Sequence, residues 1–244
     1  MTMKLSCVGC GPGDPELLTI KAMKLIKSAE VVFAPTAKEG KPSIALSIVK
    51  KYVNSSTKTV NLIFPMLKDK QALKDYWKEN TEKIANEVRA GKKVIYLTVG
   101  DPSIYSTWIY IYKELRRNHK DIEIDIIPGI TSIFAFAAEA KITLVEGDET
   151  LAIVPACYDM NRVRLTSNVC DTVIFLKDGR HFDDVIDMLP DAGFVEDSMI
   201  AIAQDVAVKG EIMKMSRLAD LRGIRRSTEK YFSIMVAKKK SDRD

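Results

Sequence analysis

The chain has 244 residues, of which 46% are hydrophobic and 29% are charged, and its 37 Lys and Arg against 33 Asp and Glu give a net charge of +4. This is the mixture of a folded globular protein with one large or two small domains, and it excludes wholesale disorder, collagen-like repeats and a disulfide-stapled miniprotein. The sequence contains no run of about 18 uncharged apolar residues, so no segment is expected to cross a membrane. The small basic excess is too weak to argue for nucleic acid.

The first 145 residues alternate between strand and helix patterns. Short apolar runs predict strands at 5–8, 31–34, 60–64, 94–99 and 122–127. Apolar residues at helical spacing predict helices at 18–29, 44–52, 73–88, 104–117 and 132–140. Either Asp14 with Pro15 caps the first helix, or Thr19 starts it later. The alternation predicts an α/β fold with a mostly parallel sheet and crossover helices.

The polar turn at 146–149 (Glu-Gly-Asp-Glu) predicts a boundary between two α/β domains, 1–145 and 146–244. Beyond it, strands are expected at 151–154, 172–176, 199–203, 211–215 and 231–236. Helices are expected near 161–165, 182–189 and 218–221. Because the alternation is less regular here, we expect a mixed sheet in the second domain.

The four cysteines are Cys7, Cys10, Cys157 and Cys170. The first two have C-x-x-C spacing, but the second half of a zinc site is missing, so no metal is expected. Buried free thiols are the favoured interpretation, with a redox pair as the alternative. The N-terminus enters a glycine-rich turn too soon to be a secretory signal, so a cytoplasmic location is expected.

Three glycine-bearing turns follow strands of the first half, and in a parallel sheet such turns collect at one edge, where ligands bind. The first turn, 9–14, is not a dinucleotide fingerprint, because Asp14 occupies the place of the third glycine and Pro12 removes an amide. This disfavours a dehydrogenase. A tight structural turn remains the alternative.

The second turn, 98–105, contains Gly100, which lets a ligand approach the backbone closely, and Asp101, which offers a carboxylate. Alternatively, Asp101 is simply the N-cap of the next helix, with Pro102 as its first residue. The third turn, 128–132 (Pro-Gly-Ile-Thr-Ser), brings small residues to a helix N-terminus. Its amides and hydroxyls could hold a carboxylate or a ribose, or only cap the helix.

Together, G-x-G-P-G-D-P-E-L-L-T at 9–19, G-D-P-S-x-Y at 100–105 and P-G-I-T-S at 128–132 resemble the tetrapyrrole methylase family, in order and over essentially the whole chain. Three stretches, 11–19, 97–107 and 146–152, resemble its C20-methyltransferase branch in cobalamin synthesis. The resemblance implies an S-adenosylmethionine-dependent enzyme that methylates C20 of precorrin-2 or of its cobalt-loaded counterpart, cobalt-factor II.

The resemblance also implies two α/β domains with the active site in the cleft between them, commonly in a homodimer. Positions matching the family's cofactor-binding residues are Pro12, Val99, Gly100, Asp101, Ile104, Thr131, Ser132 and, with differing residue types, Lys177 and Val206.

Methyl transfer from a sulfonium to a carbon needs alignment of donor and acceptor and no nucleophilic side chain. The reaction also releases the C20 proton, which a base can take up. Asp14 and Asp101 are candidates by location only, so the catalytic role stays unassigned. The acceptor carries eight carboxylates, which calls for cations. The candidate cations are Lys38, Lys41, Arg162, Arg164, Arg180 and Lys209.

Two rival interpretations stay open. One is another tetrapyrrole methylase, acting on uroporphyrinogen or a later precorrin. The other is a non-catalytic, metabolite-binding α/β module. A nucleic-acid-binding protein is disfavoured, because the basic residues are interspersed with acidic ones and no aromatic-basic stripe appears.

Overall fold

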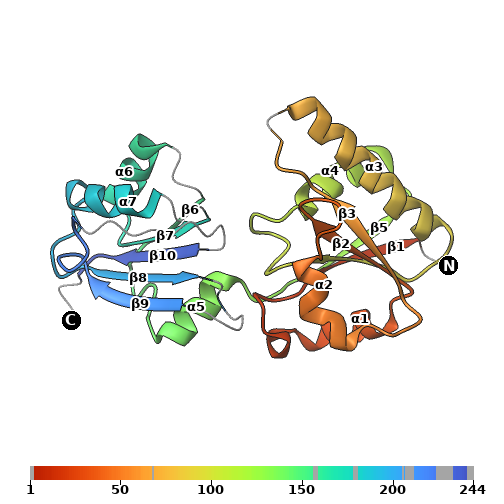
Figure 1. Cartoon of the computed structure of the whole chain (residues 1–244), viewed down its shortest axis with the longest axis horizontal. Coiled ribbons are helices and arrows are strands. Elements are labelled where there is room, and N and C mark those ends of the chain that lie inside the picture. Colours follow the sequence, from red (N-terminus) through yellow and green to blue (C-terminus); the bar gives the residue numbers. More distant parts are fainter. Residues whose placement is uncertain are drawn as a thin grey trace. The chain divides into compact units, whose positions relative to one another are not determined.

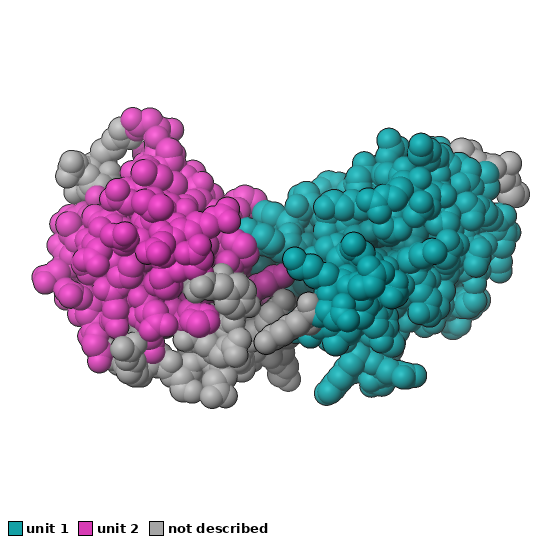
Figure 2. Space-filling view, turned by 90° about the horizontal axis from the view of Figure 1, so that it is seen from above, with its two compact units in different colours: residues 1–132 teal, residues 133–244 magenta. Residues whose placement is uncertain are grey.

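The computed structural model describes residues 3–67, 69–155, 159–177, 181–204, 206, 212–223 and 233–240. These residues form two compact units, 1–132 and 133–244 (Figure 2). The sequence analysis expected the boundary at 145/146. In the structure the two units divide at 132/133, at the start of the helix predicted at 132–140. Among the helices of the described ranges, none has the length and apolar character needed to cross a bilayer.

The first unit is built on one sheet of five strands, all parallel, in the order β3-β2-β4-β1-β5. The strands are β1 (Lys4–Gly9), β2 (Val31–Thr36), β3 (Lys58–Ile63), β4 (Val94–Thr98) and β5 (Glu123–Ile127). β4 lies in the middle and all its residues are buried, as its continuous apolar run predicted. The predicted parallel sheet is therefore confirmed.

Helices cover both faces of this sheet (Figure 1). They are α1 (Ile20–Ser28), α2 (Ile44–Val49), α3 (Lys70–Arg89) and α4 (Trp108–Asn118), with single 3-10 turns at η1 (Pro15–Leu17) and η2 (Lys50–Tyr52). Phe33 and Tyr96 pack with α3 and α4 on one face. Their chain neighbours Val32 and Leu97 pack with α1 and α2 on the other, because successive strand side chains point to opposite faces.

The predicted helix at 104–117 is wrong at its start, because α4 begins only at Trp108. The residues before it form a turn that is tied back to β4 by side chains. Thr98 Oγ1 and Ser106 Oγ lie 2.7 Å apart and are buried, and Tyr96 Oη lies 2.8 Å from Thr107 Oγ1. The Ser106 hydroxyl also accepts the amide of Trp108, the first residue of α4, at 3.1 Å.

As predicted, the sheet of the second unit is mixed. Its strand order is β6-β7-β10-β8-β9, and among these strands only β6 and β7 pair in parallel. Its strands are β6 (Leu151–Pro155), β7 (Thr172–Leu176), β8 (Met199–Gln204), β9 (Ile212–Arg217) and β10 (Ser233–Lys238). Its helices are α5 (Ser132–Ala140), α6 (Met160–Val169), α7 (Phe182–Met188) and the 3-10 turn η4 (Leu189–Ala192). α6 and α7 pack against β7 and β10 around Phe175 and Met235.

The helix predicted near 218–221 is wrong. These residues form turns, in which Leu218 and Leu221 are buried. The Leu218 amide donates to the Ser198 carbonyl at 2.9 Å, which holds the segment against the start of β8.

Cys7 and Cys10 are buried free thiols, as predicted, and burial raises the pKa of both, that of Cys10 to about 12. Cys170 is a half-buried free thiol, and Cys157 lies outside the described residues. Within those residues, no three His, Cys, Asp or Glu side chains gather in the way a metal ion requires.

Candidate functional site

The three glycine-bearing turns meet at the carboxyl edge of the first sheet, as the parallel arrangement predicted. They follow β1, β4 and β5, and β1 pairs with both of the other two. The first and second turns also bond directly. The Cys10 amide donates to Thr98 O at 2.8 Å and the Gly100 amide to Gly11 O at 2.7 Å. The edge is therefore one connected backbone surface.

Two glycines, Gly9 and Gly129, allow the turns to approach this closely. A Cβ atom at Gly129 would lie 2.2 Å from the Gly100 carbonyl oxygen and 2.9 Å from the Gly9 carbonyl carbon. A Cβ atom at Gly9 would lie 2.7 Å from both the Gly100 oxygen and the Gly129 nitrogen. Because these neighbours are backbone atoms, no rotamer change relieves the clash, and only glycine fits.

In the first turn, Thr19 starts the first α-helix, as one of the two alternatives predicted, whereas Asp14 caps a separate 3-10 turn. Asp14 Oδ1 accepts the Glu16 amide at 2.8 Å and caps η1, which begins at Pro15. Thr19 Oγ1 accepts the Ala22 amide at 3.1 Å and caps α1. Pro12 is buried at the tip of this turn.

In the second turn, Asp101 does not cap a helix. Its Oδ1 accepts the Ser103 amide at 2.8 Å and also the Ser103 hydroxyl. Its Oδ2 accepts the Gly129 amide at 2.9 Å. Burial alone would raise the pKa of the Asp101 carboxyl, but the hydrogen bonds from Ser103 and Gly129 outweigh it and hold that pKa below its ordinary value. Asp101 is thus a carboxylate at neutral pH that links two turns.

Seven of the predicted cofactor-binding positions lie on these turns. Pro12, Gly100 and Thr131 are buried, whereas Val99, Asp101, Ile104 and Ser132 are half-buried, so the surface is partly open. Gly100 has a φ of +68°, which a side chain would strain, and a Cβ there would approach the Thr131 Cα to 3.9 Å. The second and third turns therefore lie close together beside the candidate positions.

The other two predicted positions belong to the second unit. Lys177 follows β7 with a φ of +64°, and its amide donates to Ser233 O at 3.0 Å. Burial lowers the pKa of the Lys177 amine. Val206 is buried. A role for Lys177 and Val206 in cofactor binding stays a prediction.

The candidate cations are distributed over both units. Lys38 and Lys41 are exposed in the loop after β2, where the Thr36 hydroxyl donates to Lys41 O at 3.0 Å. Arg162 and Arg164 are exposed on α6. The remaining two, Arg180 and Lys209, lie outside the described residues.

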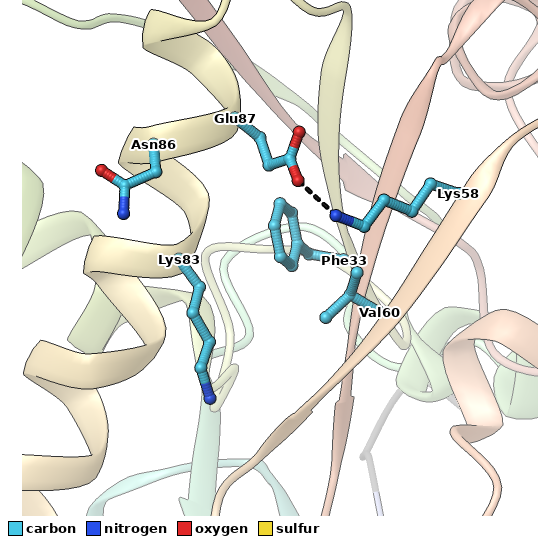
Figure 3. A pocket seen from close by; sticks show the side chains of 6 residues that line it. All are labelled: Phe33, Lys58, Val60, Lys83, Asn86 and Glu87. Atoms are coloured by element: carbon cyan, nitrogen blue, oxygen red, sulfur yellow. Dashed lines mark hydrogen bonds and ion pairs between the residues drawn. The ribbon is translucent and has the colours of Figure 1, made fainter.

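A separate hollow of about 250 Å³ opens between α3 and the early part of β3 (Figure 3). It is lined by Phe33, Lys58, Val60, Lys83, Asn86 and Glu87. Lys58 Nζ lies 2.5 Å from Glu87 Oε1, so these two charges neutralise each other. Lys58 pairs with Val31 at the amino end of the sheet, and the hollow is therefore distinct from the edge that carries the turns.

The sequence did not indicate the bond between Asp101 and Gly129. The two residues are 28 positions apart, and nothing in the local pattern of either turn connects them. The only available signal was topological: a carboxylate after one strand and a glycine amide after another strand of the same parallel edge.

Comparison with known proteins identifies relatives of similar sequence. A probable cobalt-precorrin-2 C(20)-methyltransferase of Methanocaldococcus jannaschii is 42% identical over 177 residues, which cover 72% of this chain and 73% of that protein. A cobalt-precorrin-2 C(20)-methyltransferase of Salmonella typhimurium is 32% identical over 196 residues, which cover 80% and 81%.

Among solved structures, a uroporphyrin-III C-methyltransferase of Thermus thermophilus in complex with S-adenosyl homocysteine has a TM-score of 0.67 and covers 96% of this chain and 97% of that one. At 18% identity it shows the shared fold alone. Residues 4–222 match the model of the tetrapyrrole (corrin/porphyrin) methylases. This match spans most of the chain and includes all three turns, and the chain belongs to the tetrapyrrole methylase family.

Proposed function

We propose that this protein transfers a methyl group from S-adenosylmethionine to C20 of precorrin-2 or cobalt-factor II in cobalamin biosynthesis. The supporting observation is the similarity, over more than two thirds of each chain, to two relatives named as cobalt-precorrin-2 C(20)-methyltransferases. The identified family and the connected edge of three turns agree with it.

The cofactor is proposed to bind on the carboxyl edge of the first sheet. A protein with the same fold was solved with S-adenosyl homocysteine, the demethylated form of the proposed cofactor. The edge suits such a molecule, because its glycines keep side chains away from a backbone surface rich in amides and carbonyls. The positions proposed to contact it are Pro12, Val99, Gly100, Asp101, Ile104, Thr131, Ser132, Lys177 and Val206.

Methyl transfer requires little from the protein beyond the alignment of donor and acceptor. When bound, the cofactor supplies a methyl group already activated on a sulfonium. The residues of the chain orient it toward the electron-rich acceptor and exclude water, which is worth roughly 7–11 kcal/mol of the barrier in well-aligned reactions. The rigid contact among Gly9, Gly100 and Gly129 provides a fixed platform for this purpose.

The acceptor is an anionic tetrapyrrole, and we propose that exposed cations bind its carboxylates. Lys38 and Lys41 follow β2, whose carboxyl end belongs to the same sheet edge as the turns. Arg162 and Arg164 are the arginines of α6. The double variant Arg162→Ala/Arg164→Ala is expected to weaken tetrapyrrole binding and to leave cofactor binding unchanged in calorimetry. Unchanged tetrapyrrole affinity would remove this assignment.

The homodimer and the cytoplasmic location expected from the sequence remain part of the proposal. Sedimentation equilibrium of the purified protein tests the first, and cell fractionation tests the second. A monomer at micromolar concentration would contradict the dimer.

The function is tested by incubation with a methyl-labelled cofactor and, in parallel, precorrin-2, cobalt-factor II or uroporphyrinogen III. The proposal predicts label in one or both of the first two. Label only with uroporphyrinogen would identify a different methylase of the family, and cofactor binding without any transfer would identify a non-catalytic module.

A further inference from the structure

One side chain of the second turn holds the backbone of the third. Asp101 Oδ2 accepts the Gly129 amide at 2.9 Å, and this bond passes across the end of β1, which lies between β4 and β5. Gly9 ends β1, and a Cβ atom there would lie 2.7 Å from the Gly129 nitrogen. The crossing is therefore possible only because Gly9 has no side chain.

Both oxygens of the Asp101 carboxylate are engaged. Oδ1 accepts the amide and hydroxyl of Ser103, and Oδ2 accepts Gly129. All three donors are neutral. These three bonds occupy three of the four lone-pair positions of the carboxylate, which leaves one on Oδ2. A general base must point a free lone pair at the proton that it removes, and its pKa should lie near the working pH. The pKa of Asp101 is instead lowered, since its hydrogen bonds outweigh the effect of burial.

We propose that Asp101 is a positioning residue and not the proton acceptor of the reaction: its carboxylate holds Gly129 and thereby sets Thr131 and Ser132 against Gly100. This inference rests on the proposed function, because it concerns how the turns bind S-adenosylmethionine. Two turns fixed before the ligand arrives lose less conformational freedom on binding than two independent ones.

The link itself is tested without any ligand, by hydrogen exchange of the Gly129 amide. In the wild-type protein this amide is expected to exchange slowly, and Asp101→Asn is expected to speed its exchange about tenfold or more. An asparagine that turns its oxygen toward Ser103 points its amide group at Gly129, where another donor already stands. An unprotected Gly129 amide in the wild-type protein would overturn the proposal, whether or not the variant folds.

Asp69→Asn is the matched control. Asp69 Oδ1 also accepts two amides, those of Gln71 at 2.8 Å and Ala72 at 3.2 Å, but it caps α3 and links no turns. Asparagine is an equally good N-cap, so this variant should leave both the Gly129 exchange rate and cofactor binding unchanged.

Binding and turnover then separate positioning from proton transfer. Asp101→Asn should weaken the affinity for S-adenosylmethionine and S-adenosyl homocysteine about tenfold. Its kcat at saturating substrates should stay within a few-fold of wild type, with an unchanged pH profile. A kcat loss of about 100-fold at unchanged affinity, with loss of one limb of the profile, would make Asp101 the proton acceptor and overturn the inference.

Ser103→Ala tests whether the link between the turns matters, as opposed to the local turn alone. This variant removes one donor to Oδ1 and keeps the bond to Gly129, so cofactor affinity should fall no more than about threefold. An effect as large as that of Asp101→Asn would contradict the proposal. If the wild-type protein bound no S-adenosylmethionine at all, the proposed function would fail, while the exchange experiment would still decide the role of Asp101 in the fold.

Discussion

The tripeptide Gly-Asp-Pro occurs twice in this chain, at 13–15 and at 100–102, and the two copies do different things. Locally they are alike, because Asp14 and Asp101 each accept the amide two residues ahead at 2.8 Å. Asp14 then caps the short helix that begins at Pro15. Asp101 uses its second oxygen for Gly129, and the helix after it starts only at Trp108.

The difference comes from the sheet and not from the tripeptide. The second copy follows β4, and the end of β1 beside it carries only the glycine backbone of Gly9. A carboxylate there can reach the turn after β5. Identical local sequence therefore gives an identical local hydrogen bond, while the neighbouring strands decide whether the side chain also makes a long-range one.

The largest effect is expected where the second copy meets the third turn. Gly129→Ala places a Cβ atom 2.2 Å from the Gly100 oxygen, so the turns must separate. We expect a loss of about 3 kcal/mol in the free energy of unfolding, measured by urea denaturation, together with the loss of cofactor binding. Gly40→Ala is the control, because Gly40 has a φ of +73° but nothing within 4 Å of its Cβ position, and about 1 kcal/mol is expected there.

The comparison is sharpened by making one substitution in both copies. Asp101→Asn loses a charge-assisted bond to a partly buried amide and should cost about 1–3 kcal/mol of stability. Asp14→Asn keeps an acceptor for the Glu16 amide and should change stability by no more than about 0.5 kcal/mol. Equal costs in urea denaturation would show that the long-range bond contributes nothing.

The smallest effect is a change in the acid dependence of stability. The pKa of Asp101 is lowered on folding, so its ionised form stabilises the fold above the unfolded pKa of about 3.9, and this contribution is lost as the pH falls through the lower folded pKa. Asparagine cannot titrate. The stability difference between wild type and Asp101→Asn should therefore shrink as the pH is lowered from neutral to about 3.

A difference between the two proteins that stayed constant over this pH range would contradict a lowered pKa for Asp101. Comparing the two proteins at each pH removes the contribution of the other carboxyl groups, since both chains share them.

Much of the fold could be predicted from apolar patterns, because these report burial directly. The run at 94–99 marked β4 at the centre of the sheet, and the alternation of patterns marked the parallel topology. The helix at 104–117 was predicted too early because Ile104 fits a helical face by spacing. The bonds of Ser106 and Thr107 to β4 are tertiary, and no periodicity reveals them.

The location of the candidate site could also be predicted from the sequence. The glycines and the resemblance located the turns, and the predicted parallel sheet placed them on one edge. The role of Asp101 could not be predicted, because helix capping and bridging between turns require the same residue. Only the position of Gly129 across β1 distinguishes the two roles.

The central claim is that these turns bind S-adenosylmethionine for methylation at C20. The most direct measurement is a carbon-13 NMR spectrum of the product formed from precorrin-2 or cobalt-factor II with a methyl-labelled cofactor. The account predicts a single labelled methyl group on C20, and a label at any other ring carbon, or none with either acceptor, would contradict it.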